Sequence, residues 1–144
     1  MIPNDTLLLE YLKPIWRWTD DIQNDFASRA DWCVKSFDQA NHPPVVRLGN
    51  KLDINTRPGS KILLSANGTY DPDNDKLTYK WWFYKEPSSF RGNIKIENST
   101  SQNASLVVPN VITEETEIHI ICQVMDNGLP NLTRYKRVVI NVKP

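Results

Sequence analysis

The sequence predicts a mainly β fold: an immunoglobulin-like antiparallel β-sandwich of about seven strands, preceded by an N-terminal α-helical segment. An acidic turn at residues 71–75 leads into an aromatic strand at residues 77–84, and a second acidic turn at residues 126–128 closes a later strand. Short β-branched or alternating runs lie between turn signals such as Pro58-Gly59 and Asn127-Gly128. This pattern is typical of an extracellular sandwich rather than a catalytic domain.

The first part of the chain has the composition of helices. Residues 5–37 contain no glycine. Apolar or buried-type residues recur near helical spacing along it: Ile15, Trp18, Ile22, Phe26 and Cys33. Pro14 suits the first turn of this helix, where a missing amide costs nothing. A shorter helix is expected over residues 6–13, with Asp5 as its cap.

After Pro43-Pro44 the pattern becomes that of an all-β domain. We therefore divide the chain into a helical segment at residues 1–42 and a sandwich domain at residues 43–144. The expected strands cover residues 45–48, 60–66, 78–84, 94–96, 104–108, 117–125 and 135–142. About seven short strands in about 100 residues is the number found in an immunoglobulin-type sandwich.

Composition argues against several functions. Lysine plus arginine and aspartate plus glutamate both total 17, so the net charge is zero. The longest basic run, residues 134–137, is expected to be a charged edge strand, and we predict no nucleic-acid partner. No apolar run approaches the roughly 20 residues of a membrane span. Residues 1–5 lack the features of a secretory signal, so the signal of an exported parent would lie upstream.

The sequence predicts no catalytic residues. Cys33 and Cys122 are far apart, make no metal-ligand spacing and are expected to be free thiols. His42 is expected in a linker, and His119 on the outward side of its strand, as a surface or hydrogen-bonded residue. These two histidines assemble no nucleophile–base set. Aspartates in turns also match poorly to the buried acid of a glycoside hydrolase.

The acidic turns are the candidate metal site. Asp71, Asp73 and Asp75 are spaced by one residue, and Asp126 is expected at the same end of the sandwich. Calcium takes about six to eight oxygen ligands, which carboxylates in such a loop can supply. Calcium is therefore the one candidate cofactor. The alternative is a tight turn in which aspartates accept hydrogen bonds from nearby backbone amides.

Alternation divides the aromatic strand into two faces. One face is wholly apolar or aromatic and is expected in the core: Leu77, Tyr79, Trp81 and Phe83. Trp82 and Tyr84 then point outward and are the candidate carbohydrate-binding residues, because adjacent aromatic rings can stack on a sugar. The alternative is that the N-terminal helix covers them through Trp16, Trp18 or Trp32.

Seven stretches of the chain carry a family resemblance: WRW at 16–18, QNDFASRADWCV at 23–34, ANHPPV at 40–45, DPDNDKLTYKWW at 71–82, IHII at 118–121, DNGLP at 126–130 and LTRYKR at 132–137. Together they resemble the C-terminal portion of a bacterial family of secreted, cellulose-binding-like proteins. Members carry an N-terminal nucleoside-hydrolase-like domain and a C-terminal immunoglobulin-like domain. The resemblance implies that residues 1–42 are the tail of that hydrolase-like domain. The aspartate cluster of nucleoside hydrolases is not matched here, so no catalytic residue carries over.

The resemblance implies a non-catalytic accessory domain of a secreted or periplasmic, polysaccharide-associated protein. Its role would be weak carbohydrate binding or positioning of the preceding hydrolase-like domain, so that domain and a polysaccharide are the expected partners. A second hypothesis is a structural or protein-interaction module, rigidified by calcium. A third is that the sandwich completes the active site of the hydrolase-like domain. The oligomeric state is left open.

Overall fold

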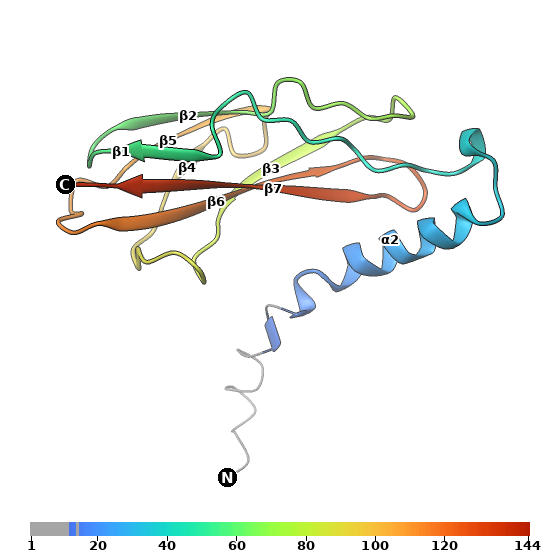
Figure 1. The fold of residues 1–144 in the computed structure, drawn as a ribbon, viewed down its shortest axis with the longest axis horizontal. Helices are drawn as coiled ribbons and strands as arrows, with labels where there is room; N and C mark the ends of the chain where they lie inside the picture. The colour runs from blue at the N-terminus through green and yellow to red at the C-terminus, as the bar shows by residue number, and fades with distance from the viewer. Residues whose placement is uncertain (1–11, 14) are drawn as a thin grey trace, which may run out of the picture.

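Two β-sheets stacked on each other form the body of the molecule, and one α-helix lies beside one end of them (Figure 1). The computed structural model describes residues 12, 13 and 15–144. The larger sheet has the strand order β1-β7-β6-β3 and the smaller one β2-β5-β4. The strands are β1 (Asp53–Thr56), β2 (Lys61–Ser65), β3 (Thr78–Phe83), β4 (Ile96–Glu97), β5 (Asn103–Val107), β6 (Thr116–Met125) and β7 (Thr133–Val142). The predicted sandwich of about seven strands is confirmed.

The edge of the larger sheet differs from the prediction. β1 pairs in parallel with β7, with Asp53 opposite Val139, so this sheet is mixed and not wholly antiparallel. Residues 45–48, predicted to be a strand, form a single bridge between Val45 and Tyr70. Val46 and Leu48 pack against the hydrophobic core. Their apolar character therefore reflects burial and not strand pairing.

The core between the sheets follows the predicted alternation. Trp81 is only 2% exposed and donates its indole N–H to the carbonyl of Ser101 at 3.0 Å. The inward side chains of β6 are fully buried: Ile118, Ile120, Cys122 and Val124. Burial of such apolar side chains stabilises the fold by about 1.5–3 kcal/mol each. The predicted division of the aromatic strand into a core face and an outer face is confirmed, with Trp82 next to Trp81 on the outer face.

The helical segment comprises α2 (Thr19–Trp32) and the short 3₁₀ helix η1 (Phe37–Gln39). Residues 15 and 16 are helical, but residues 17 and 18 form a turn before α2 begins, so the predicted helix is interrupted. The helix expected over residues 6–13, with its cap at Asp5, lies outside the described residues except for residues 12 and 13, which are helical. No helix in the described part of the chain is long and apolar enough to cross a membrane.

Candidate functional site

The first acidic turn is organised by Asp71. Its Oδ1 accepts hydrogen bonds from the backbone N–H of Asp73 at 2.8 Å and of Asp75 at 3.2 Å. Asn74, between them, has a positive φ of 63°, which asparagine tolerates better than most residues. The turn therefore has the Asx geometry that aspartates favour. This geometry points the one-residue-spaced carboxylates toward one another.

Three of the four predicted calcium ligands come together in this turn. One carboxylate oxygen from each of Asp71, Asp73 and Asp75 lies within 4.8 Å of the others. Asp71 is 7% exposed, and its Oδ2 is buried without a hydrogen-bond partner. Burial, together with the negative charges of Asp71 and Asp73, raises the pKa of Asp75. The turn thus concentrates negative charge that its own hydrogen bonds do not neutralise.

Asp73 has a histidine partner that the sequence did not predict. The backbone N–H of His42 donates to Asp73 Oδ2 at 2.6 Å, and its ring Nδ1 lies 3.1 Å from Asp73 Oδ1. The His42 ring also stacks on Phe37 and Trp32, with ring centroids 3.8 and 5.6 Å apart. His42, predicted to be a simple linker residue, instead fastens the helical segment to the acidic turn.

Asp126, the fourth predicted ligand, lies outside the group of three. The two acidic turns do meet at one end of the sandwich, because the backbone N–H of Lys76 donates to Asn127 Oδ1 at 2.7 Å. Asp126 is 2% exposed and accepts hydrogen bonds from the backbone of Leu132 and from the side chain of Asn41. Burial raises the pKa of Asp126, these hydrogen bonds oppose the rise, and the charge of Asp71 adds to it.

The outward aromatic pair lies against the segment that precedes α2. The Trp18 ring is 5.9 Å from Trp82, 6.3 Å from Tyr84 and 4.7 Å from Tyr135, measured between centroids. The guanidinium of Arg17 lies 5.2 Å from the Trp82 ring centroid. Trp82 and Tyr84 are both half-buried. Of the three tryptophans expected to cover the pair, Trp18 makes this contact, whereas Trp16 is exposed.

One face of α2 is attached to the sandwich by polar contacts. Asp25 accepts a hydrogen bond from Arg134 at 2.8 Å, and Asn24 donates to Asn131 at 2.9 Å. The Tyr135 hydroxyl donates to Asp21, and burial followed by this contact raises the pKa of Tyr135. The guanidinium groups of Arg29 and Arg134 outweigh partial burial and lower the pKa of Asp25. α2 is therefore held in one orientation on β7.

Several apolar side chains of the helical segment are exposed to solvent and do not pack on the sandwich. Ile22 is 64% exposed and Phe26 is 75% exposed, and they are one helical turn apart on α2. Ile15 and Trp16, just before α2, are also exposed. We call these four residues the apolar face. Ile22 also lines a hollow with Asp21, Asp25 and Arg134, so the apolar face borders the contact between α2 and the sandwich.

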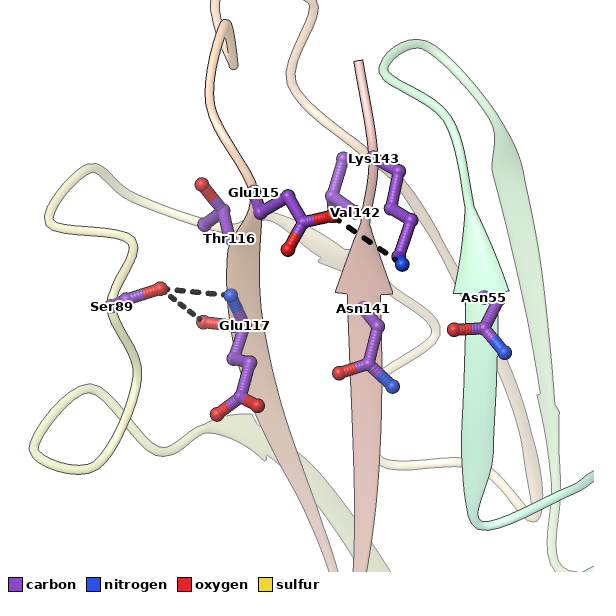
Figure 2. A pocket seen from close by; sticks show the side chains of 8 residues that line it. All are labelled: Asn55, Ser89, Glu115, Thr116, Glu117, Asn141, Val142 and Lys143. Atoms are coloured by element: carbon purple, nitrogen blue, oxygen red, sulfur yellow. Dashed lines mark hydrogen bonds and ion pairs between the residues drawn. The ribbon is translucent and has the colours of Figure 1, made fainter.

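A polar hollow of about 460 Å³ lies on the outer face of the larger sheet (Figure 2). Glu117, Asn141 and Asn55 stand side by side on β6, β7 and β1. At its rim, Glu115 pairs with Lys143 at 3.4 Å, and the Ser89 hydroxyl accepts a hydrogen bond from the backbone of Glu117. None of the described residues that line this hollow is aromatic. Both carboxylates are exposed, unlike the buried acid that glycoside hydrolysis requires.

Two further predictions can be compared with the structure. Among the described residues both cysteines are free thiols, as predicted, with Cys33 exposed and Cys122 buried. His119 is on the outer face of β6 as predicted, but it is 7% exposed, so its assignment to the surface was wrong. The segment after β3 covers it: Tyr84 N–H donates to the His119 carbonyl, and the Ser88 hydroxyl accepts from the His119 N–H. The sequence of β6 alone does not indicate that this loop covers His119.

Comparisons with known proteins agree with this fold. A family model described as "Cellulose-binding protein Sde0182, C-terminal domain" matches residues 61–142, from β2 to the end of β7. A comparison with curated proteins found no match.

Among solved structures, the chain is similar to a nucleoside hydrolase-related hypothetical protein from Saccharophagus degradans that is associated with carbohydrate metabolism. The two share 41% sequence identity with a TM-score of 0.84, over 88% of this chain and 32% of that one. This chain therefore spans about a third of that protein's length. A PKD domain from the KIAA 1837 protein shares 21% identity over 69% of this chain and 87% of that one, with a TM-score of 0.48, and supports no functional inference.

The family match covers more than half of the chain, and the similarity to the Saccharophagus degradans protein covers 88% of it. These findings confirm the resemblance seen in the sequence and indicate a carbohydrate-related accessory domain. The chain belongs to the family of cellulose-binding protein Sde0182 C-terminal domains.

Proposed function

We propose that this chain is the non-catalytic accessory sandwich of a secreted or periplasmic, polysaccharide-associated protein, and that it holds the domain preceding it in that protein. The observation that carries this proposal is the orientation of α2. Polar contacts to β7 and to Asn131 just before it attach α2, and the apolar face formed by Ile15, Trp16, Ile22 and Phe26 is left exposed. Exposed apolar clusters of this kind mark interaction surfaces.

The proposed occupant of the apolar face is the polypeptide that comes before this chain. The matching family model is that of a C-terminal domain, and the similar Saccharophagus degradans protein has about two thirds of its length without a counterpart here, since 32% of it is covered. The apolar face lies in the N-terminal segment, next to where such a domain would connect. Burial of Ile22 and Phe26 would contribute about 1.5–3 kcal/mol each.

The test uses the full-length parent protein. Ile22→Ser with Phe26→Ser should separate the two domains, so that calorimetry resolves two unfolding transitions and scattering shows a larger radius of gyration. Val111→Ser with Leu129→Ser is the matched control, because both residues are exposed apolar side chains on sandwich loops. An unchanged radius and an unchanged unfolding profile in the α2 variant would contradict a domain-holding role.

A second candidate role is that of a calcium-rigidified module. The observation that favours it is the buried Asp71 Oδ2, which has no hydrogen-bond partner beside the carboxylates of Asp73 and Asp75. A bound Ca²⁺ would supply the missing positive charge and strengthen the turn. The melting temperature of the chain should then rise when calcium replaces chelator. An identical melting temperature in both conditions would exclude this role.

A further inference from the structure

A second hollow, of about 650 Å³, lies beside the outer face of β3 and is distinct from the polar one in Figure 2. Trp82 on the outer face and Phe83, which also packs against the core, are the aromatic residues among those that line it. Most of the other lining residues are basic: Lys13, Arg17, Lys80, Lys85 and Arg91. Its volume is within the range of about 300–1,000 Å³ that is usual for ligand sites.

The charge of this hollow departs from that of the whole protein. The chain has no net charge, yet Glu86 is the one acidic residue among the described residues that line the hollow. Glu86 is already paired with Arg17 at 2.6 Å, and the hydrogen bond from Arg17 lowers the pKa of Glu86. Within the described residues, Lys80, Lys85 and Arg91 have no carboxylate within the 4.0 Å of an ion pair. Lys80, Lys85 and Arg91 therefore present three positive charges to the hollow that no carboxylate of the described residues neutralises.

Aromatic and basic groups that converge in one hollow recognise a ligand with both flat apolar surface and negative charge. Sugar rings stack on aromatic side chains, and carboxylates accept hydrogen bonds from lysine and arginine. We propose that this hollow binds an acidic polysaccharide whose sugar rings carry carboxylates, as in a polyuronate. The carbohydrate-related family supports a saccharide as the ligand, and the positive charges of the hollow support a ligand that carries carboxylates. The inference does not depend on the domain-holding role.

A neutral glucan fits this hollow less well. Hydroxyl groups would have to displace water from three cations without neutralising them, and leaving desolvated charges unpaired is costly. An acidic chain would pair with them instead. Attraction of this kind is screened by salt, so the proposed binding should weaken steeply as ionic strength rises.

The experiment is isothermal titration of the chain with polygalacturonate, at low and at physiological salt. Binding is expected, with a dissociation constant that rises at least tenfold between the two conditions. Fully methyl-esterified polygalacturonate has the same rings without the charges and should bind at least tenfold more weakly, as should cello-oligosaccharides. Polyglutamate carries comparable charge without sugar rings and should also bind at least tenfold more weakly.

Two charge-reversal variants locate the site. Lys80→Glu with Lys85→Glu should reduce polygalacturonate affinity at least tenfold. Lys51→Glu with Arg57→Glu changes the net charge equally on exposed positions that flank β1, at the opposite edge of the larger sheet, and should leave affinity within twofold. Equal loss in both variants, no binding by the unmodified chain, or equal binding of polyglutamate would overturn the proposal. The melting temperature of each variant checks that it is folded. Because the domain-holding test measures unfolding transitions and the radius of gyration, its result is independent of these affinities.

Discussion

Asn41 and Asp126 join the end of the helical segment to the turn between β6 and β7. The side-chain amide of Asn41 donates to both carboxylate oxygens of Asp126, at 3.2 Å each, and to the carbonyl of Pro130 at 2.8 Å. Both residues are buried. The two are 85 positions apart in the sequence, so the contact holds distant parts of the chain together. It also explains Gly128, where a Cβ would lie 2.2 Å from the Asn41 side chain.

Asn41→Ala should destabilise the protein by about 1–3 kcal/mol, because the buried Asp126 carboxylate and the Pro130 carbonyl each lose a donor. The free energy of unfolding in urea measures this effect. Asn67→Ala, at an exposed turn position, is the control and should change it by less than about 0.5 kcal/mol. Equal changes in the two variants would show that the Asn41 contact has no net stabilising effect.

Asp75→Asn separates charge repulsion from calcium binding. In chelator at neutral pH the variant should melt slightly higher than the unmodified chain, because Asp75 no longer repels Asp71 and Asp73. With calcium, the unmodified chain should gain more than the variant, since the variant has one ligand carboxylate fewer. Asp53→Asn, on the exposed edge strand β1, is the control for a lost surface charge.

The pH dependence of the Asp75 effect has a definite sign. The folded pKa of Asp75 is raised above its ordinary value of 3.8, so the folded protein binds this proton more tightly than the unfolded chain. The resulting contribution to stability is fully present below 3.8 and is lost as pH rises through the folded pKa. The melting temperatures of the two proteins in chelator should therefore converge as the pH falls. A difference that grows on acidification would contradict the raised pKa of Asp75, which burial and the charges of Asp71 and Asp73 produce.

Trp18→Ala should destabilise the protein by about 2 kcal/mol, because it removes ring contacts to Trp82, Tyr84 and Tyr135 together with their buried area. Trp16→Ala is a matched control two positions away, at a side chain that is 54% exposed. It should cost less than about 0.5 kcal/mol in the isolated chain. Chemical denaturation followed by far-ultraviolet circular dichroism distinguishes them, and equal losses would refute the contact.

The two thiols should react at very different rates. Burial raises the pKa of Cys122 to about 12, so its reactive thiolate is scarce at neutral pH, whereas Cys33 is exposed. Maleimide labelling of the native protein should add one group by mass spectrometry, and labelling in denaturant should add two. Cys33→Ser should abolish the fast addition. A native protein that takes up no label would indicate a disulfide.

Local patterns predicted much of the site because the relevant residues are close in sequence. Carboxylates spaced by one residue in a tight turn meet whatever the rest of the fold does, so the grouping of Asp71, Asp73 and Asp75 followed from spacing. The separation of Trp81 from Trp82 followed from the two-residue period of a strand. His42 and Asn41 escaped prediction because their partners, Asp73 and Asp126, lie 31 and 85 positions away.

The error at the sheet edge has a similar origin. Residues 45–48 are apolar except for Arg47, whereas Ile54 is the one apolar residue of β1, so composition favoured the wrong segment as the edge strand. β1 became the edge strand because the backbone groups at the open edge of β7 form hydrogen bonds with it. Likewise, the alternation of β6 placed His119 on the outer face, but only the loop after β3 buries it.

The sequence by itself determined the sandwich class, the buried faces of its strands and the identity of the acidic turn, since these depend on periodicity and turn chemistry within a few residues. The tertiary structure alone decided that Trp18 lies on Trp82, that α2 is attached to the sandwich and leaves Ile22 and Phe26 exposed, and that several basic side chains gather around one hollow. Such relationships depend on the three-dimensional packing of segments that are distant in the chain, and no local pattern specifies that packing.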